Sequence, residues 1–233
     1  MEDNNFNQAT HRRGFLGTIA AGAAAMGIAT LAAPLALSAE ATNASVPMDD
    51  SDAWFNKVNG KHRIVFDATG PHEIFPFAWP RVFLMSNEKT GTPEKDSTAV
   101  VILRHGAIPY AMETSLWAKY KFGEVFKVDD PVTKAPSVRN AFWKPGPDDF
   151  KVPGLGSVPI GINQLQDSGV MFCVCNVALT VYGAALAPGM NMDASTVYKE
   201  FVAGVLPGIQ IVPSGVWAVG RAQEHKCAYC FVG

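Results

Sequence analysis

The chain has 233 residues, of which 48% are hydrophobic and 17% charged, a composition that fits one globular domain and excludes a wholly disordered chain. Its 19 basic and 21 acidic residues give a net charge of -2 at pH 7, so there is no overall positive field to hold a nucleic acid. The four cysteines are too few for a disulfide-rich miniprotein, so each must be judged by its position.

Residues 1–41 have the order of a signal peptide. The pair Arg12-Arg13 precedes a stretch without charges between Thr18 and Ala39, and the segment ends in Ala39-Glu40-Ala41, which fits a small-x-small cleavage site. The arginine pair and the residues that follow it resemble the twin-arginine consensus. We therefore expect a periplasmic mature protein and the twin-arginine export machinery as a partner. An ordinary Sec signal and an uncleaved membrane anchor are the alternatives.

Apolar runs and helical patterns alternate after a polar lead-in at residues 42–60, whose amphipathic piece, Asp52–Phe55, we expect to pack on the body. The runs predict five strands, at residues 63–66, 99–103, 170–174, 209–212 and 228–232. The segments between them predict helices at residues 73–86, 109–122, 159–167, 176–186, 195–205 and 214–224. Such short apolar strands are typically covered on both faces. Residues 61–233 are thus predicted to form an α/β domain, a three-layer sandwich with a mostly parallel five-stranded sheet.

One stretch, residues 127–158, departs from this pattern because it is rich in Pro, Gly, Lys and Asp. Its prolines exclude a long helix or a central strand, so we expect a long loop. Loops of this length are usually functional or mobile. Phe142 and Trp143 could fold this Pro-rich segment over a pocket as a cover, or could simply pin a surface excursion.

Cys175 is the most interesting single residue. It follows an apolar run and precedes Asn176, where a helix is predicted to begin. In a parallel sheet this edge is where ligands bind, and the amides of a helix start favour anions. The amides beyond Asn176 would therefore favour a thiolate, which is the nucleophilic form of cysteine. The alternative is a buried cysteine that fills space as a small hydrophobe.

Other predicted strand ends bring polar groups to the same edge. His105 and Gly106 follow the second strand, and His105 either supplies a proton or hydrogen bond there or is a loop histidine without a catalytic task. Asp67 ends the first strand, in a loop whose amides could bind an anion. Ser214 and Gly215 follow the fourth strand, and Ser214 is placed to cap the next helix.

The remaining cysteines are weaker candidates. Cys227 and Cys230 form a C-x-x-C pattern, which suggests a redox pair or a metal site. If residues 228–232 form a strand, the two cysteines lie ~10 Å apart on opposite faces, which forbids a bridge. Cys173 would share a face with Cys175, and we interpret it as core. A zinc site of all four thiolates fits the count but not the usual spacing, so no metal is predicted.

Several segments together resemble exported members of the DsrE/DsrF-like family, over roughly residues 50–233. The segments are Gly60–Arg63, Val65–Asp67, Val101–Gly106, Phe172–Leu179, Val212–Val216 and Ala222–Glu224. The resemblance implies a flavodoxin-like α/β sandwich, often a homo-oligomer, and in the better understood members a cysteine that carries sulfur as a persulfide. Cys175 is the position that looks like that cysteine. Export, the Pro-rich segment and the carboxy-terminal cysteine pair depart from the pattern of the sulfur carriers.

Two functions follow as hypotheses. The first is an exported sulfur-handling or thiol-redox protein, in which Cys175 attacks or carries a sulfane sulfur that a donor or acceptor protein exchanges with it. The second is a non-catalytic periplasmic module that binds a small anionic ligand or a cofactor at the carboxyl edge of the sheet, beneath the Pro-rich segment. The sequence names no cofactor, and a fold does not fix a function.

Overall fold

The structure, a computed structural model, describes residues 51–233. The expected signal peptide over residues 1–41 and the start of the lead-in lie outside the described residues. All described residues belong to one compact unit, Thr42–Gly233. None of the helices within them is both long and apolar enough to cross a membrane.

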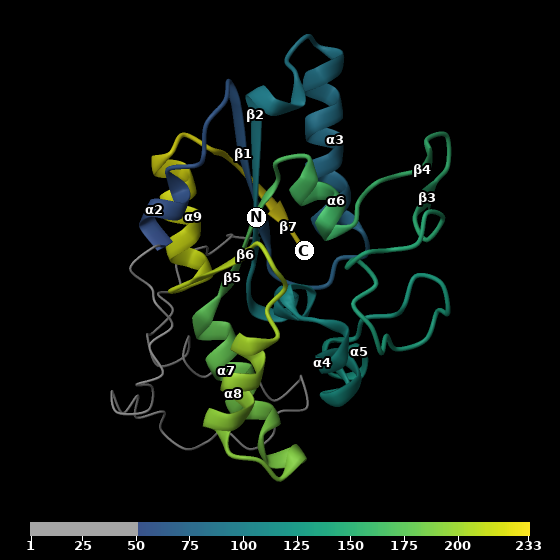
Figure 1. Ribbon diagram of the computed structural model, residues 1–233, viewed down its shortest axis with the longest axis vertical. Coiled ribbons are helices and arrows are strands. Elements are labelled where there is room, and N and C mark those ends of the chain that lie inside the picture. Colours follow the sequence, from purple (N-terminus) through teal and green to yellow (C-terminus); the bar gives the residue numbers. More distant parts are fainter. Residues whose placement is uncertain (1–50) are drawn as a thin grey trace, which may run out of the picture. The chain divides into compact units, whose positions relative to one another are not determined.

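Five parallel strands form the central sheet (Figure 1). They are β1 (His62–Ala68), β2 (Ser97–Leu103), β5 (Met171–Cys175), β6 (Ile209–Val212) and β7 (Ala228–Val232). The strands lie in the order β6-β5-β2-β1-β7, and every neighbouring pair is parallel. The five strands predicted from the sequence are therefore confirmed. From β1 the chain adds β2, β5 and β6 on one side, and then returns to add β7 on the other side of β1.

The central strand β2 shows why such segments form strands. Each of its seven residues is buried, because its side chains alternate between two covered faces of the sheet. Val100 and Ile102 belong to the smaller hydrophobic cluster, on one face. Val101 and Leu103 belong to the larger cluster, on the other face. The core of the protein thus consists of two apolar layers separated by the sheet.

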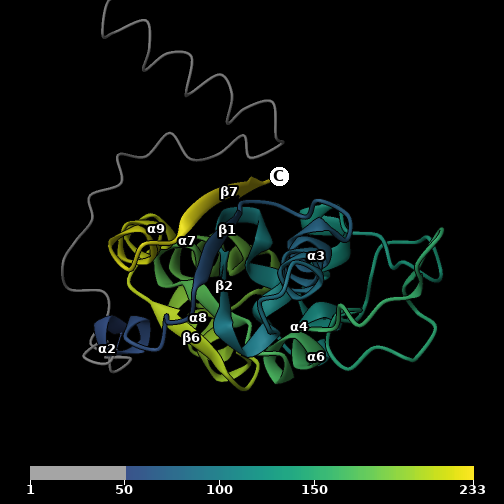
Figure 2. The same cartoon turned by 90° about the horizontal axis from the view of Figure 1, so that it is seen from above.

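Helices cover both faces of the sheet, which confirms the predicted three-layer sandwich and a flavodoxin-like architecture (Figures 1 and 2). One face carries α3 (Phe75–Lys89) and α6 (Ile162–Asp167), and the other carries α2 (Ser51–Phe55) and α9 (Gly215–Glu224). The helix α2 contains the predicted amphipathic piece, and its Trp54 and Phe55 are buried in the smaller cluster. That part of the lead-in packs on the body as predicted.

Two further helices, α7 (Asn176–Leu186) and α8 (Ala194–Ala203), pack against each other. They extend beyond the carboxyl end of the sheet, at the bottom of Figure 1. Short 3-10 turns complete the connections, η1 at Glu94–Asp96 and η3 at Pro188–Met190. Because α7 begins directly after β5, its first residues lie at the edge where the strands end.

The single helix predicted at residues 109–122 is wrong. The chain forms a 3-10 helix η2 (His105–Ala111) and two short α-helices, α4 (Thr114–Lys119) and α5 (Phe122–Phe126). The break after η2 arises because Met112 is extended and forms an isolated antiparallel bridge with Val205. A second break follows α4, where Lys121 adopts a left-handed conformation with φ of 51°. A distant contact therefore overrides the local helical pattern.

The Pro-rich segment is a long loop, as predicted. Its regular structure is a two-residue antiparallel pair, β3 (Lys151–Val152) with β4 (Gly156–Ser157). Phe142 holds the segment on α3, because its ring stacks on that of Phe77 with centroids 4.2 Å apart. On its other side it stacks on the ring of Phe150 at 4.7 Å. The loop is thus pinned by an aromatic residue, and that residue also lines a cavity beneath it.

Candidate functional site

The ends of β2, β5 and β6 surround an open pocket of about 220 Å³, here called the Cys175 pocket. Four residues predicted for the site contribute to its walls: His105, Cys175, Ser214 and Gly215. They come from three strand ends that are distant in sequence. They meet because the carboxyl ends of parallel strands share one edge of the sheet.

Cys175 is the last residue of β5 and the N-cap of α7. Its Sγ accepts a hydrogen bond from the Ala178 backbone N–H at 3.3 Å, in the manner of an N-cap oxygen. The residue is 6% exposed and lines the pocket. Its sulfur therefore lies at a helix start and at a cavity wall, the two positions that the sequence predicted for it.

Arg104 brings a fixed positive charge to the same pocket. It follows β2 directly, and its Nε and Nη2 donate to the two carboxylate oxygens of Asp67 at 2.6 and 2.9 Å. The hydroxyl of Tyr229 donates to the same carboxylate at 2.8 Å. The Asp67 side chain is 3% exposed and that of Arg104 27%. Asp67 is thus a buried anchor that orients a guanidinium reaching solvent.

A guanidinium is always charged in proteins, and the hydrogen bond to Asp67 raises the pKa of Arg104 further above its ordinary value. Its Nη1 donates to no residue within 51–233. Gly215 makes room for the side chain, since a Cβ there would lie 2.6 Å from the Arg104 Cβ. Asp67 itself lines a neighbouring hollow that includes Arg104 and Tyr229.

His105 lies at the mouth of the Cys175 pocket, in a left-handed conformation with φ of 50°. Its Nδ1 lies 3.2 Å from the hydroxyl of Tyr182, which comes from α7. Burial raises the pKa of Tyr182, so its phenol stays neutral near pH 7 and can donate to the imidazole. This contact fixes the ring beside the pocket that Cys175 lines.

Two other predicted residues have partners elsewhere and do not line the pocket. The Asn176 Oδ1 accepts from the hydroxyl of Tyr198 at 2.8 Å, which ties α7 to α8. The Gly106 N–H donates to the Thr69 carbonyl at 2.9 Å, and the Thr69 N–H donates to the Val232 carbonyl at 3.2 Å. The amide of Thr69 is therefore not available to an anion. Ser214, which does line the pocket, caps α9 as predicted, because its hydroxyl accepts from the Trp217 N–H at 3.2 Å.

The other three cysteines are free and lie apart from the pocket. Cys173 is fully buried in the smaller cluster, as predicted for core, and Cys227 belongs to that cluster too. Cys230 packs instead against the larger cluster, and so does Cys175. In a regular strand, Cys173 and Cys175 would lie on the same face of the sheet. Here they pack in different clusters, because the chain turns into a helix at Cys175.

Burial raises the pKa of each of these three thiols, that of Cys227 to about 11. Within residues 51–233, no three His, Cys, Asp or Glu side chains gather in a way that could hold a metal ion. Because the thiols of Cys227 and Cys230 pack in different layers, the geometry argues against a redox bridge between them.

Sequence reasoning missed three residues around the pocket: Arg104, Tyr182 and Tyr229. One signal was present for Arg104, which is a charged residue placed immediately after a wholly apolar strand. Tyr182 and Tyr229 carry no such signal. Tyr182 contacts His105, which lies 77 positions away in the chain, and Tyr229 contacts Asp67, which lies 162 positions away.

Comparison with known proteins assigns this chain to no family. Neither the protein-family models nor the curated proteins give a match. Among solved structures, the chain is similar to a protein of unknown function from Methanobacterium thermoautotrophicum, with 17% sequence identity and a TM-score of 0.34. The alignment covers 74% of this chain and 100% of the other.

Proposed function

We propose that this protein handles sulfur through Cys175, which takes up a sulfane sulfur as a persulfide and passes it on. The observation that supports this most is the place of its Sγ, which accepts the Ala178 N–H at a helix start and faces an open pocket. A thiolate is a better acceptor for that N–H than a thiol. The Cys175 sulfur is thus hydrogen-bonded at a helix start and lines a pocket that a sulfur donor can enter.

The proposed step is an exchange without net oxidation. The Cys175 thiolate attacks the outer sulfur of a persulfide or polysulfide donor and forms a new S–S bond. The S–S bond of the donor breaks, and its electron pair leaves on the donor thiolate. His105 lines the pocket, and its imidazole can donate a hydrogen bond to this thiolate as it leaves. Transfer to an acceptor thiolate reverses the same sequence.

Negative charge remains on the terminal sulfur of the bound persulfide. The Ala178 N–H, at the positive end of α7, lies beside Cys175 and can stabilise this charge. Val177, Val181 and Val216 surround the opening, each more than half exposed. An apolar surround of this kind strengthens charge interactions by lowering the local dielectric constant.

The test is residue-resolved mass spectrometry on the purified, fully reduced chain. Alkylation at pH 7 should modify Cys175 first, because burial raises the pKa of the other three thiols. Polysulfide treatment should then add one sulfur atom to Cys175, and dithiothreitol should remove it. A Cys175→Ser variant should lose this uptake.

The matched control is Cys230→Ser, because Cys230 is the most accessible of the other cysteines and lies outside the pocket. That variant should take up sulfur as the unchanged chain does. Sulfur found on Cys230 in the unchanged chain, or uptake that survives in Cys175→Ser, would contradict the proposal.

A further inference from the structure

A second cavity, of about 380 Å³, lies beneath the Pro-rich segment and shares no lining residue with the Cys175 pocket. We call it the loop cavity. One side comes from the loop after β1 and from η2 and α4, and the other from residues 127–142. Its volume falls in the range of small-molecule sites. Its charged and aromatic lining includes Glu73, Tyr110, Trp117, Lys127, Asp129 and Lys134.

The floor of the loop cavity is aromatic. Tyr110, Trp117 and Phe142 line it, and all three are buried. The ring centroid of Tyr110 lies 5.8 Å from that of Trp117 and 5.4 Å from that of Phe142. Such a floor favours a ligand with a flat or otherwise apolar body.

The hydroxyl of Tyr110 is a polar group without a partner in this floor. Trp117 is satisfied, since its Nε1 donates to the Pro109 carbonyl at 2.9 Å. Tyr110 is only 2% exposed, and its hydroxyl makes no hydrogen bond to another residue within 51–233. Burial raises the pKa of Tyr110, so the phenol is a neutral donor near pH 7. Tyr110 lines the loop cavity and its hydroxyl is not among the fully buried unpaired polar atoms, so an acceptor on a ligand can reach this donor from the cavity.

The mouth of the loop cavity carries both signs of charge. Lys127 and Lys134 line it together with Glu73 and Asp129, and none of the four forms an ion pair within the described part of the chain. Glu73, Lys127 and Lys134 also adopt left-handed backbone conformations, with φ of 48°, 56° and 58°. Non-glycine residues rarely adopt this conformation. Two positive and two negative groups are thus available to a ligand.

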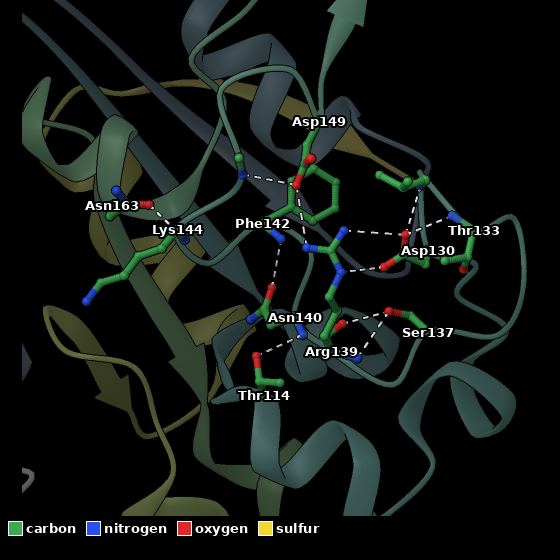
Figure 3. A network of polar contacts seen from close by, with 12 residues as sticks. Thr114, Asp130, Thr133, Ser137, Arg139, Asn140, Phe142, Lys144, Asp149 and Asn163 are labelled. Carbon is green, nitrogen blue, oxygen red and sulfur yellow. Dashed lines mark hydrogen bonds and ion pairs between the residues drawn. The ribbon is translucent and has the colours of Figure 1, made fainter.

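A side-chain network holds the outer side of the loop cavity (Figure 3). The Asp130 carboxylate accepts from the Arg139 Nε at 2.6 Å and from the Val132 N–H at 2.8 Å. The buried Asn140 donates to the carbonyls of Tyr110 and Met112, both at 2.8 Å. Arg139 and Asp130 therefore neutralise each other. Asn140 joins the segment to Tyr110, so hydrogen bonds within the chain hold this wall of the cavity in place.

We propose that the loop cavity binds a small zwitterion of the α-amino acid class, with an apolar body that ends in a hydrogen-bond acceptor. Lys127 and Lys134 take the carboxylate, and Glu73 and Asp129 take the ammonium group. The body lies on Trp117 and Phe142, and its far end accepts from the hydroxyl of Tyr110. None of these contacts involves Cys175, so ligand binding in the loop cavity can be tested independently of the sulfur chemistry.

Isothermal titration calorimetry with four probes tests each of these contacts. L-Tyrosine carries all the required groups. L-Phenylalanine lacks the acceptor at the far end, tyramine lacks the carboxylate, and 3-(4-hydroxyphenyl)propionate lacks the ammonium group. We expect L-tyrosine to bind most tightly and each of the other probes to bind roughly ten-fold more weakly, because each lacks one of the three polar groups that the site contacts.

Variants then connect each loss to a residue. Tyr110→Phe should make L-tyrosine and L-phenylalanine bind equally. Lys134→Ala should weaken L-tyrosine but not tyramine, which has no carboxylate to lose. Lys144→Ala is the matched control, because Lys144 is an exposed lysine of the same segment with φ of 52° that does not line the cavity. Absence of binding by all four probes, equal binding of all four, or equal effects of Lys134→Ala and Lys144→Ala would overturn the proposal.

Discussion

The Cys175 pocket and the loop cavity lie along the same edge of one sheet but are held by different kinds of contact. In the Cys175 pocket, strand ends and helix starts place the reactive groups, and one ion pair, Asp67 with Arg104, completes them. In the loop cavity, side chains such as Asp130 and Asn140 bind backbone groups that no strand or helix satisfies. The first arrangement fixes one atom for chemistry, whereas the second supports a surface that surrounds a whole molecule.

Removal of the buried carboxylate should have the largest effect on the first region. In Asp67→Ala the Arg104 guanidinium and the Tyr229 hydroxyl lose their acceptor. We expect the free energy of unfolding to fall by about 3 kcal/mol, the low end for a broken buried pair because Arg104 keeps access to solvent. Urea unfolding measures the change. The control Tyr229→Phe removes one hydrogen bond and should cost about 1 kcal/mol. Equal losses in the two variants would show that the ion pair is not the main contact.

Gly215 offers a smaller change in the same region. In Gly215→Ala the new Cβ would lie 2.6 Å from both the Cβ and the Cδ of Arg104, so the arginine must move from its place. We expect a loss of about 1–2 kcal/mol from this overpacking. The rate of Cys175 alkylation should change as well, since the Arg104 side chain lines the same pocket and would move. Both effects are measured on one preparation, by urea unfolding and by mass spectrometry.

Gly220 supplies the matched control within the same helix, α9. A Cβ there would have no atom within 4 Å. Gly220→Ala should therefore raise the free energy of unfolding by about 0.5–1 kcal/mol, because alanine is the better helix former. It should leave alkylation of Cys175 unchanged. If Gly215→Ala also stabilised the protein, the close packing of Arg104 on α9 would be refuted.

The same difference between the regions explains what could be predicted from the sequence. Apolar runs are local, and they located all five strands and placed Cys175 at a strand end. The partner of Arg104 could not be predicted in this way, because it depends on the register of β1 beside β2, which aligns Asp67 with Ile102. The helix predicted at residues 109–122 is broken for a similar reason, because the distant residue Val205 forms a bridge with Met112.

The loop cavity was beyond prediction for a further reason. The prolines of residues 127–158 indicated a loop, and Phe142 was expected to pin it, but neither signal gives the path of the backbone. That path is set by side-chain hydrogen bonds over long separations, such as that from Asn140 to Tyr110, 30 positions apart. Sequence patterns report periodicity within an element, and a segment without periodicity leaves its partners undetermined.

A modest pH dependence is expected in the second region. Burial alone would raise the pKa of Asp130, but hydrogen bonds from Arg139 and from the Val132 and Thr133 N–H groups outweigh it and lower the pKa. A carboxyl group with a lowered pKa in the folded state stabilises the fold fully above its unfolded pKa of about 3.9. That contribution is lost as the pH falls through the folded value.

Asp130→Asn should therefore cost about 1 kcal/mol at pH 6, a modest value because Arg139 is partly exposed. The difference from the unchanged chain should shrink as the pH is lowered from about 4 toward 2. Urea unfolding of the two proteins across this range isolates Asp130 from other acids whose pKa is lowered, such as Glu200, because they are common to both. A difference that stayed constant with pH would mean that the charge of Asp130 contributes nothing.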